Sequence, residues 1–323
     1  MTGMAGGRTS GATLDRMIDT LDGESWYETA RLSGGDVGLG LVHHGDRDPR
    51  GVDVWESDGK GVVLFGVIAN EHELEGDRAD VLEAIVDDPG ETLPALDGPF
   101  AVAGYDATED RLVLATDKIG SRPIYYRTDG KMQFASSLDA LLPGIDDPRI
   151  DVQAVSDMLM LGQVWGEKTL LEDVAALPPA TMAVVDGQDV RRERYWHLSF
   201  EEASPGDHYV FELATKYRQA VANMAHTLEG DVGLFLSGGL DSRSLLSVLA
   251  GARASESTPE RTPVATPERT SVSTPGRSEE TVPGLDSFST FTYDANPQSG
   301  KEPELAARIA ALVGVENRPV ELT

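Results

Sequence analysis

The residues best suited to do chemistry are six consecutive ones, Ser237-Gly238-Gly239-Leu240-Asp241-Ser242. An apolar run at 232–236 precedes them and an amphipathic run at 243–250 follows, which predicts a strand, a tight turn and a helix. Adjacent glycines allow that turn and leave no Cβ to block a ligand. The free amides at the helix start and the positive end of its dipole would face an anion such as a phosphate chain, with the two serines as hydroxyl donors.

A simpler interpretation is a glycine-rich connection in which Asp241 or Ser242 only caps the helix. The order of strand, serine-flanked glycines, acid and helix favours the binding role. No lysine follows the glycines, so the segment is not the common phosphate loop that ends in Gly-Lys-Ser or Gly-Lys-Thr.

Composition bounds the functions that the chain can have. A length of 323 residues favours two domains. The net charge is −28, with 55 acidic and 27 basic residues. Such a surface repels nucleic acid and anionic membranes, so neither is expected as a partner. Acid-rich, lysine-poor composition is typical of proteins from a high-salt cytoplasm, where potassium screens the self-repulsion, and we expect a halophilic source.

Cysteine and membrane signals are also informative. The chain has no cysteine, which excludes disulfides and thiolate metal sites. Its N-terminus lacks an apolar signal core, and the longest apolar run, 62–69, is too short to span a bilayer. We therefore expect a soluble, cytoplasmic protein. The pair His43-His44 would project to opposite faces of a strand, which favours an exposed strand end over a metal site.

Short apolar or alternating runs predict a strand-rich first part. The predicted strands are 62–68, 100–105, 111–116, 123–127, 131–135 and 181–185, and the predicted helices are 81–86 and 152–161. The second and third strands form one hairpin, and the fourth and fifth form another across the turn Asp129-Gly130.

The second part changes in pattern. A linker at 199–206 precedes an amphipathic helix at about 208–228. The stretch 252–284 is rich in Pro, Thr, Ser and charge, which predicts a disordered insertion. A strand at 287–293, a helix at 304–313 and a short strand at 319–322 are expected after it.

Taken together, these features resemble the glutamine-hydrolysing asparagine synthetase family. Beside the loop, four segments in the correct order carry the resemblance: Asp97-Gly-Pro-Phe-Ala, Thr116-Asp-Lys-Ile-Gly-Ser-Arg-Pro-Ile-Tyr-Tyr126, Phe134-Ala-Ser-Ser-Leu-Asp-Ala-Leu141, and Leu177-Pro-Pro179 with Tyr195-Trp196. The resemblance covers nearly the whole chain.

The resemblance implies a fold of mixed α/β and α+β class. Residues 1–198 would form an N-terminal-nucleophile (αββα) glutaminase-like domain. Residues 207–323 would form the first part of a Rossmann-like ATP pyrophosphatase domain. By the same resemblance, the loop holds the pyrophosphate of ATP, Leu236 and Tyr293 lie near the adenine, and Asp241 lies near Mg²⁺. ATP and Mg²⁺ are the cofactors implied.

Several positions depart from the family pattern. Thr2 stands where the family has its nucleophilic cysteine. A terminal threonine can act with its own amine as base, but its hydroxyl is the poorer nucleophile. Phe65 and Val67 replace the asparagine and glutamate that hold glutamine, and Asp97 alone remains of the glutamine-binding set. We therefore expect an inactive glutaminase half.

The synthetase half is expected to be incomplete. Only three strands, 232–236, 288–293 and 319–322, are available, whereas a doubly wound sheet has at least five. The acceptor carboxylate site of the family would lie beyond them.

The sequence thus predicts an ATP-dependent, amide-forming ligase that adenylates aspartate or a related acid and then amidates it with ammonia or glutamine. The alternative is a non-catalytic nucleotide-binding protein, or one product of a split or damaged synthetase gene. The expected partners are these small molecules, together with a second copy of the chain or a protein that carries the rest of the synthetase domain.

Overall fold

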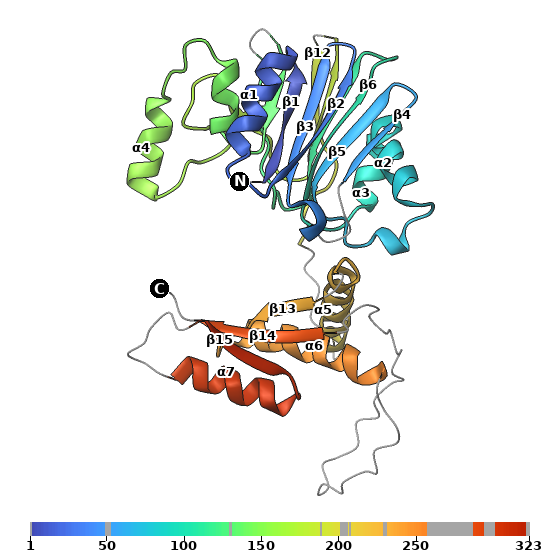
Figure 1. Cartoon of the computed structure of the whole chain (residues 1–323), viewed down its shortest axis with the longest axis vertical. Coiled ribbons are helices and arrows are strands. Elements are labelled where there is room, and N and C mark those ends of the chain that lie inside the picture. The colour runs from blue at the N-terminus through green and yellow to red at the C-terminus, as the bar shows by residue number, and fades with distance from the viewer. Residues whose placement is uncertain are drawn as a thin grey trace, which may run out of the picture. The chain divides into compact units, whose positions relative to one another are not determined.

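The computed structural model describes residues 2–48, 53–128, 131–187, 189–200, 206, 208–228, 231–256, 287–293 and 301–320. The chain divides into two compact units, Met1–Glu202 and Ala203–Thr323 (Figure 1). Among the described residues, no helix is long and apolar enough to cross a membrane.

Two six-stranded antiparallel sheets form the centre of the first unit. The first sheet contains, from edge to edge, β10 (Ala175–Ala176), β8 (Tyr125–Arg127), β9 (Gln133–Ala135), β1 (Gly3–Arg8), β3 (Val37–His43) and β2 (Glu28–Gly34). The second contains β12 (Asp189–Arg194), β11 (Thr181–Asp186), β7 (Arg111–Thr116), β6 (Phe100–Asp106), β5 (Lys60–Gly66) and β4 (Val54–Ser57). One apolar core, to which both sheets contribute, lies between them.

Helices cover the outer faces of the two sheets. They are α1 (Gly11–Leu21), α2 (Arg78–Asp87) and α3 (Pro89–Ala95); α4 (Val152–Leu161) and the short helices Gly45–Arg47, Glu71–Glu73 and Asp139–Gly144 complete the unit. The first of these packs on β1 and β3, and α2 packs on β5 and β6 (Figure 1). The layers are therefore helix, sheet, sheet, helix, and this confirms the αββα class predicted for the first half.

Glycines in β3 allow α1 to approach its sheet. A Cβ on Gly38 would lie 2.8 Å from the Leu14 side chain, and one on Gly40 would overlap Ile18. The side chains of Leu14 and Ile18 are buried, as are those of Met17 and Leu21 of the same helix. Because neither glycine has a side chain, the apolar face of the helix can pack directly on the strand.

Arg8 connects both sheets at one end of the unit. Its Nη1 donates to Asp36 in the β2–β3 turn at 2.7 Å and to Asp110 before β7 at 2.6 Å. The end of β1 and these two turns therefore lie together. The start of β1 and the ends of β3, β5 and β7 must gather at the opposite end, which we call the site end.

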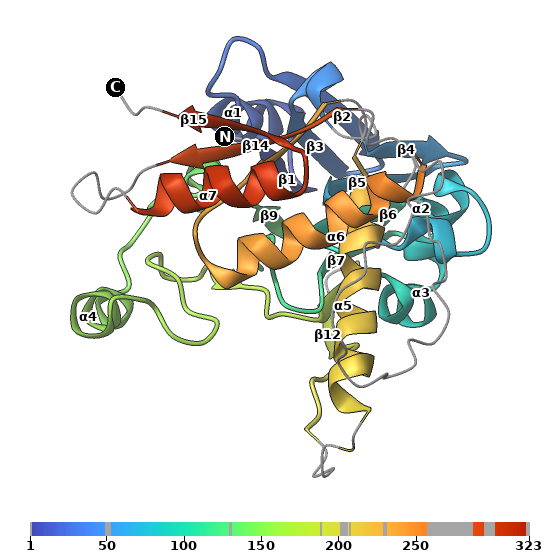
Figure 2. The same ribbon diagram turned by 90° about the horizontal axis from the view of Figure 1, so that it is seen from below.

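The second unit contains a three-stranded parallel sheet in the order β13 (Asp231–Phe235), β14 (Ser287–Tyr293) and β15 (Glu316–Val320). Its helices are α5 (Tyr209–His226), α6 (Leu240–Glu256) and α7 (Lys301–Leu312). Side chains of α6 and α7 share one apolar cluster with the sheet, so both lie on the same face of it (Figure 2). The alternation of strands and helices is that of a Rossmann-like unit, and this confirms the class predicted for the second half.

Most sequence-predicted elements are confirmed, and three predictions need correction. Both hairpins are present as β6–β7 and β8–β9, although Asp129 and Gly130 lie outside the described residues. The last strand is Glu316–Val320 rather than 319–322. The first five residues of the predicted disordered insertion, 252–256, belong to α6, since they are good helix formers that precede the first proline. Residues 257–284 lie outside the described part.

The third correction concerns the histidine pair. His43 is buried, with 8 % of its surface exposed, although an exposed strand end was predicted. The reason is that β3 lies between β1 and β2, and the residues after it fold back over its end. Gly45 N donates to His43 Nδ1 at 3.0 Å, and His44 N donates to Asp48 Oδ2 at 2.6 Å.

Gly34 tests how closely the sheets must approach. A Cβ there would overlap the ring of Tyr105, which is buried and donates to Glu56 at 2.9 Å. Burial and this carboxylate raise the pKa of Tyr105. We expect Gly34→Ala to lower the free energy of unfolding by about 1–3 kcal/mol, measured by urea denaturation. Gly11→Ala, which meets nothing within 4 Å at the start of α1, is the control. Equal losses in the two variants would contradict the close-packing argument.

Candidate functional site

The loop 237–242 lies at the carboxyl edge of the parallel sheet in the second unit. The register pairs Phe235 with Phe291, so Leu236 stands beside Thr292, and Tyr293 ends the neighbouring strand. Leu236 N donates to Phe291 O at 2.8 Å, and Thr292 Oγ1 donates to Leu236 O at 2.9 Å. The structure therefore brings Leu236, the loop and Tyr293 to the edge where open parallel sheets bind their ligands.

Two serines hold the loop closed. Ser237 N donates to Ser242 Oγ at 3.2 Å, and the two hydroxyl oxygens lie 3.0 Å apart. Gly239 N donates to Ser237 Oγ at 3.2 Å. Both hydroxyls and the amides of Ser237 and Gly239 thus converge on one turn at the start of α6. Such a cluster of donors at a helix N-terminus can bind an oxyanion.

Asp241 and Arg243 flank this turn with opposite charges. Asp241 is exposed in the first turn of α6. Arg243 Nε donates to Gly239 O at 3.0 Å, which holds the guanidinium beside the loop. Sequence reasoning did not place this arginine among the site residues, although its position one residue after the motif was a signal for it.

The start of α7 lies against the loop. A Cβ on Gly238 would be 3.2 Å from Leu305 and 3.7 Å from the Glu302 side chain. Glu302 is therefore a second carboxylate close to the turn. Sequence reasoning missed it because nothing in the motif identifies a residue more than sixty positions later. The absence of a Cβ at Gly238 is what allows this close approach.

The oxygen ligands at the loop suit a Mg²⁺ ion that is bound in part through substrate phosphates. No group of three or more His, Cys, Asp or Glu within the described part of the chain could hold a metal ion alone. Mg²⁺ is commonly bound by one or two carboxylates together with substrate phosphates, and it retains several waters. Asp241, exposed beside two hydroxyls, fits that requirement.

At the site end of the first unit, Thr2 directly precedes β1 and is partly buried. Because Gly3 pairs with Val42, continuation of the register places Thr2 opposite His43. His43 Nδ1 accepts the amide of Gly45 at 3.0 Å.

Phe65, the last residue but one of β5, lies at the same end of the sandwich and packs against the core between the sheets. The Arg122 guanidinium lies over its ring, with Cζ 4.8 Å from the ring centroid. The position that the resemblance gives to an asparagine thus carries a ring with a cation stacked on it. Val67 is held by its backbone, because Val67 N donates to Pro99 O at 3.0 Å.

Asp97 already has a counter-ion. Lys118 Nζ donates to its Oδ1 at 2.6 Å, and the Asp97 amide donates to Asn70 Oδ1 at 2.8 Å. The carboxylate is therefore paired rather than free to receive a substrate ammonium group. The structure brings Asp97, Phe65 and Thr2 to one end of the unit, where Asp97 is paired with Lys118 and Phe65 is stacked under Arg122.

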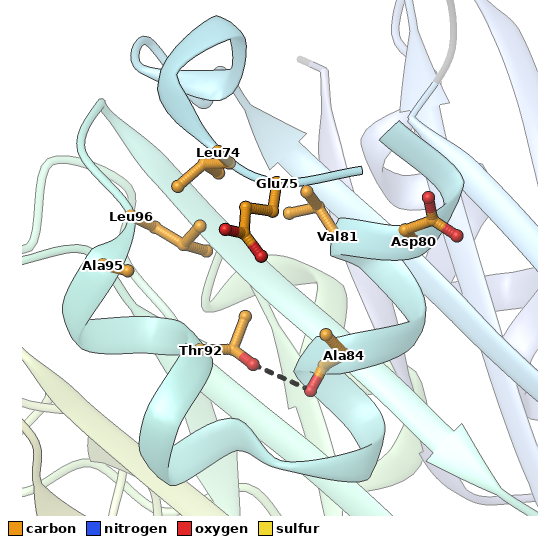
Figure 3. Close-up of a pocket in the computed structure, with 8 residues that line it drawn as sticks. All are labelled: Leu74, Glu75, Asp80, Val81, Ala84, Thr92, Ala95 and Leu96. Carbon is orange, nitrogen blue, oxygen red and sulfur yellow. Dashed lines mark hydrogen bonds between the residues drawn. The ribbon is translucent and has the colours of Figure 1, made fainter. Parts of the chain in front are cut away.

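A separate cavity of about 160 Å³ lies in the helical layer of the first unit. Figure 3 shows its lining: Leu74, Glu75, Asp80, Val81, Ala84, Thr92, Ala95 and Leu96. Thr92 Oγ1 donates to Ala84 O at 3.0 Å, and Asp80 accepts the Asp77 amide in the capping box of α2. The cavity is mainly apolar and includes none of the predicted site residues.

Comparison with known proteins assigns a class to each half of the chain. Residues 69–196 match the family model of the glutamine amidotransferase domain, and residues 212–323 match that of asparagine synthase. The chain therefore joins an amidotransferase-type domain to a synthase-type domain. Together, these two matches and the curated relatives make the chain similar to the asparagine synthetase family.

Two of these relatives come from Bacillus subtilis. Asparagine synthetase [glutamine-hydrolyzing] 3 is 26% identical over 264 residues, which are 74% of this chain and 42% of the relative. Asparagine synthetase [glutamine-hydrolyzing] 1 is 26% identical over 233 residues, which are 70% of this chain and 31% of the relative. The chain thus spans less than half the length of either protein.

Two solved structures are similar at low identity. One is the glutamine phosphoribosylpyrophosphate amidotransferase of B. subtilis with ADP and GMP, at a TM-score of 0.41 and 12% identity, covering 78% of this chain and 64% of that one. The other is described as the allosteric regulatory enzyme of purine biosynthesis, at a TM-score of 0.44 and 11% identity, covering 98% and 80%.

Ser242 is predicted to keep the loop closed. In Ser242→Ala, the Ser237 amide loses its acceptor, so its hydrogen exchange should accelerate by about 2- to 13-fold, as a net hydrogen bond of about 0.5–1.5 kcal/mol implies. Exchange measured by NMR on the full chain tests this. Ser247→Ala is the control, because that hydroxyl bonds only within α6. An unchanged Ser237 amide would show that this bond does not hold the loop.

Proposed function

We propose that the second unit binds ATP, with the pyrophosphate on the loop 237–242, and that the protein forms an amide from a carboxylic acid through an acyl-adenylate. One observation carries the proposal: two serine hydroxyls and the amides of Ser237 and Gly239 converge where α6 begins, at the carboxyl edge of a parallel sheet. Amides and a helix dipole directed at a leaving pyrophosphate stabilise the charge that develops on it.

Each neighbouring residue has a part in this proposal. Asp241 would hold Mg²⁺, which neutralises phosphate charge when it is bound. Arg243 would extend its terminal nitrogens toward the phosphates while its Nε stays on Gly239 O. Tyr293, 45% exposed at the end of β14, offers a ring for the adenine. Leu236 is buried, so it would contribute the floor of the site rather than a mobile contact.

The acceptor in this proposal is aspartate or a related carboxylate, and ammonia supplies the nitrogen. Three observations support an inactive glutaminase half: a threonine at the nucleophile position, the stacked Phe65 and Arg122, and the Lys118–Asp97 pair. The alternative, a non-catalytic nucleotide-binding protein, predicts ATP binding without adenylate formation.

The assembly and setting of the protein are part of the same proposal. The face of the sheet opposite α6 and α7 exposes Phe235, which supports cover by a second copy or by a partner that carries further synthetase residues. A high-salt cytoplasm suits the charge of −28, because screening weakens the self-repulsion of the acids.

ATP binding tests the loop. We expect Asp241→Ala and Arg243→Ser each to weaken Mg-ATP binding by roughly tenfold or more, as loss of a charged contact of about 1.5–3 kcal/mol implies. Calorimetric titration measures this, and Asp189→Ala on an exposed strand of the first unit is the control. Affinity for Mg-ATP that is the same in all four proteins would refute the loop assignment.

The same proteins distinguish an amide-forming ligase from a non-catalytic nucleotide-binding protein. Aspartate-dependent exchange between ATP and labelled pyrophosphate requires an acceptor site near the α-phosphate, since positioning supplies much of the rate. From the three-stranded sheet we predict that this chain binds ATP without such exchange until a partner supplies further residues. Exchange by the chain alone would overturn this prediction and establish adenylation directly.

Glutamine hydrolysis should be absent. In high salt with glutamine, wild type and Thr2→Ala should release glutamate at the same background rate, because the pocket positions are occupied by Phe65 and by the paired Asp97. Glutamate release that disappears in Thr2→Ala would establish a threonine nucleophile. A glutamate assay with matched buffer blanks decides between these outcomes.

A further inference from the structure

The cavity in the helical layer of the first unit has no part in the proposed reaction. Its volume is about 160 Å³, and it lies between α2, α3 and the segment that precedes α2 (Figure 3). Val81 and Leu96 in its lining are buried, and Leu74 is partly buried. Because an apolar cavity of about 150 Å³ accommodates a molecule of the size of benzene, this one has room for a ligand of about six non-hydrogen atoms.

One carboxylate lies over this apolar lining. In Figure 3 the Glu75 carboxylate is placed over the middle of the lining, between Leu96 and Val81, whereas the Asp80 carboxylate points away from it. Asp80 instead accepts the Asp77 amide at 2.8 Å in the capping box of α2. The cavity thus combines an apolar floor with a single negative charge at its mouth.

The Glu75 carboxylate is unpaired and stands on an ordered turn. It is exposed and forms no ion pair among the described residues, and Arg78 of the same segment pairs with Glu71 at 2.5 Å. Gly76 has a φ of +88°, and a Cβ on it would lie 2.7 Å from Asp80 Oδ2. Glycine therefore allows the chain to turn toward α2 directly after Glu75, and such pre-ordering lowers the entropic cost of binding a ligand.

The hydrogen-bonding groups of the lining that remain free are acceptors. The amides of Leu74, Val81, Thr92 and Leu96 all donate to backbone carbonyls. Thr92 Oγ1 donates to Ala84 O at 3.0 Å, so its hydroxyl retains only the capacity to accept. The Glu75 carboxylate also only accepts. A ligand that satisfies these groups must therefore be a hydrogen-bond donor, and a positive charge would be favoured.

We propose that this cavity binds a small aliphatic primary ammonium compound. Its charged end would donate to Glu75, in a hydrogen bond strengthened by both charges, and its alkyl chain would be buried against Val81, Ala84 and Leu96. An anion would be repelled by Glu75, and a neutral alcohol would gain only the apolar burial. The proposal concerns the first unit and does not depend on ATP binding in the second.

The position of the charge favours a free amine over a lysine side chain of a partner protein. Because Glu75 is exposed and the buried lining is apolar, the alkyl end of the ligand must enter first. A lysine would enter with its ammonium group first and place that charge against the apolar floor, which is costly. The net charge of −28 attracts every cation, so the alkyl chain is what makes the cavity selective.

The test observes the lining of the cavity directly. The whole chain, labelled with ¹³C in the methyl groups of leucine and valine, is titrated at constant ionic strength and followed by NMR. The probes are n-butylammonium chloride, ammonium chloride, 1-butanol and sodium butyrate, and loss of a signal in Val81→Ile assigns the Val81 methyl groups. We expect the Val81 signals to shift saturably with n-butylammonium, at an affinity about tenfold or more above that for 1-butanol. Ammonium and butyrate should give no saturable shift.

Two variants and a matched control complete the test. Glu75→Gln should weaken n-butylammonium binding by about tenfold or more and leave the affinity for 1-butanol unchanged. Ala84→Met fills the cavity without a change of charge and should abolish both. Glu91→Gln removes an exposed charge from the first turn of α3, outside the lining, and should change neither titration.

Several outcomes would overturn the proposal. They are a non-saturating response of Val81 to n-butylammonium, equal affinities for n-butylammonium and 1-butanol, and an unaltered n-butylammonium titration in Glu75→Gln. Equal weakening in Glu75→Gln and Glu91→Gln would overturn it as well, because the amine would then respond only to the general charge of the surface.

Discussion

Close approach at glycines is the constraint on which the rest of the structure depends. In the first unit, side chains on Gly34, Gly40 or Gly104 would collide with Tyr105, Ile18 or Val86 respectively. These contacts set the separation between the two sheets and between each sheet and its helix. Because the layers are so close, the large apolar side chains interdigitate at the density of a native core. Arg8 bonds Asp36 and Asp110 and so joins the two sheets at one end of the unit; the site end is the opposite end.

The same constraint shapes the second unit. Gly233 lies against the ring of Phe291, and Gly238 lies against the start of α7. The first contact positions the end of β13 beside β14, and the second brings a helix to the edge of the loop. A phosphate-binding turn needs backbone amides that a ligand can reach, which side chains at these positions would obstruct.

Local patterns in the sequence were enough to predict most elements but not their long-range contacts. Alternating apolar residues predicted β6 and β7, and the Ser-Gly-Gly-Leu-Asp-Ser motif predicted the turn before α6. β1 was missed, because Gly3-Met-Ala-Gly-Gly-Arg8 has no β-branched residue and gains its strand character from neighbours on both sides. The burial of His43 depends on residues that fold over the strand end.

Contacts between distant residues were similarly inaccessible. Phe65 and Arg122 meet only because β5 and β7 end at the same edge of one sheet. Glu302 reaches the loop because α7 returns to the carboxyl edge. Sequence spacing carries no information on such pairs, whereas the motif itself is contiguous. The residues of the loop were therefore predictable one by one, and the groups that surround them were not.

The acid-rich composition affects how each half of the chain can bind an anion. With 27 basic residues against 55 acidic ones, the chain has few cations that are not opposed by acids. Backbone amides and a helix dipole attract phosphate without adding a basic side chain, and their fixed geometry is insensitive to the acid-rich composition. In the first unit, most cations neutralise neighbouring acids, as Lys118 does for Asp97.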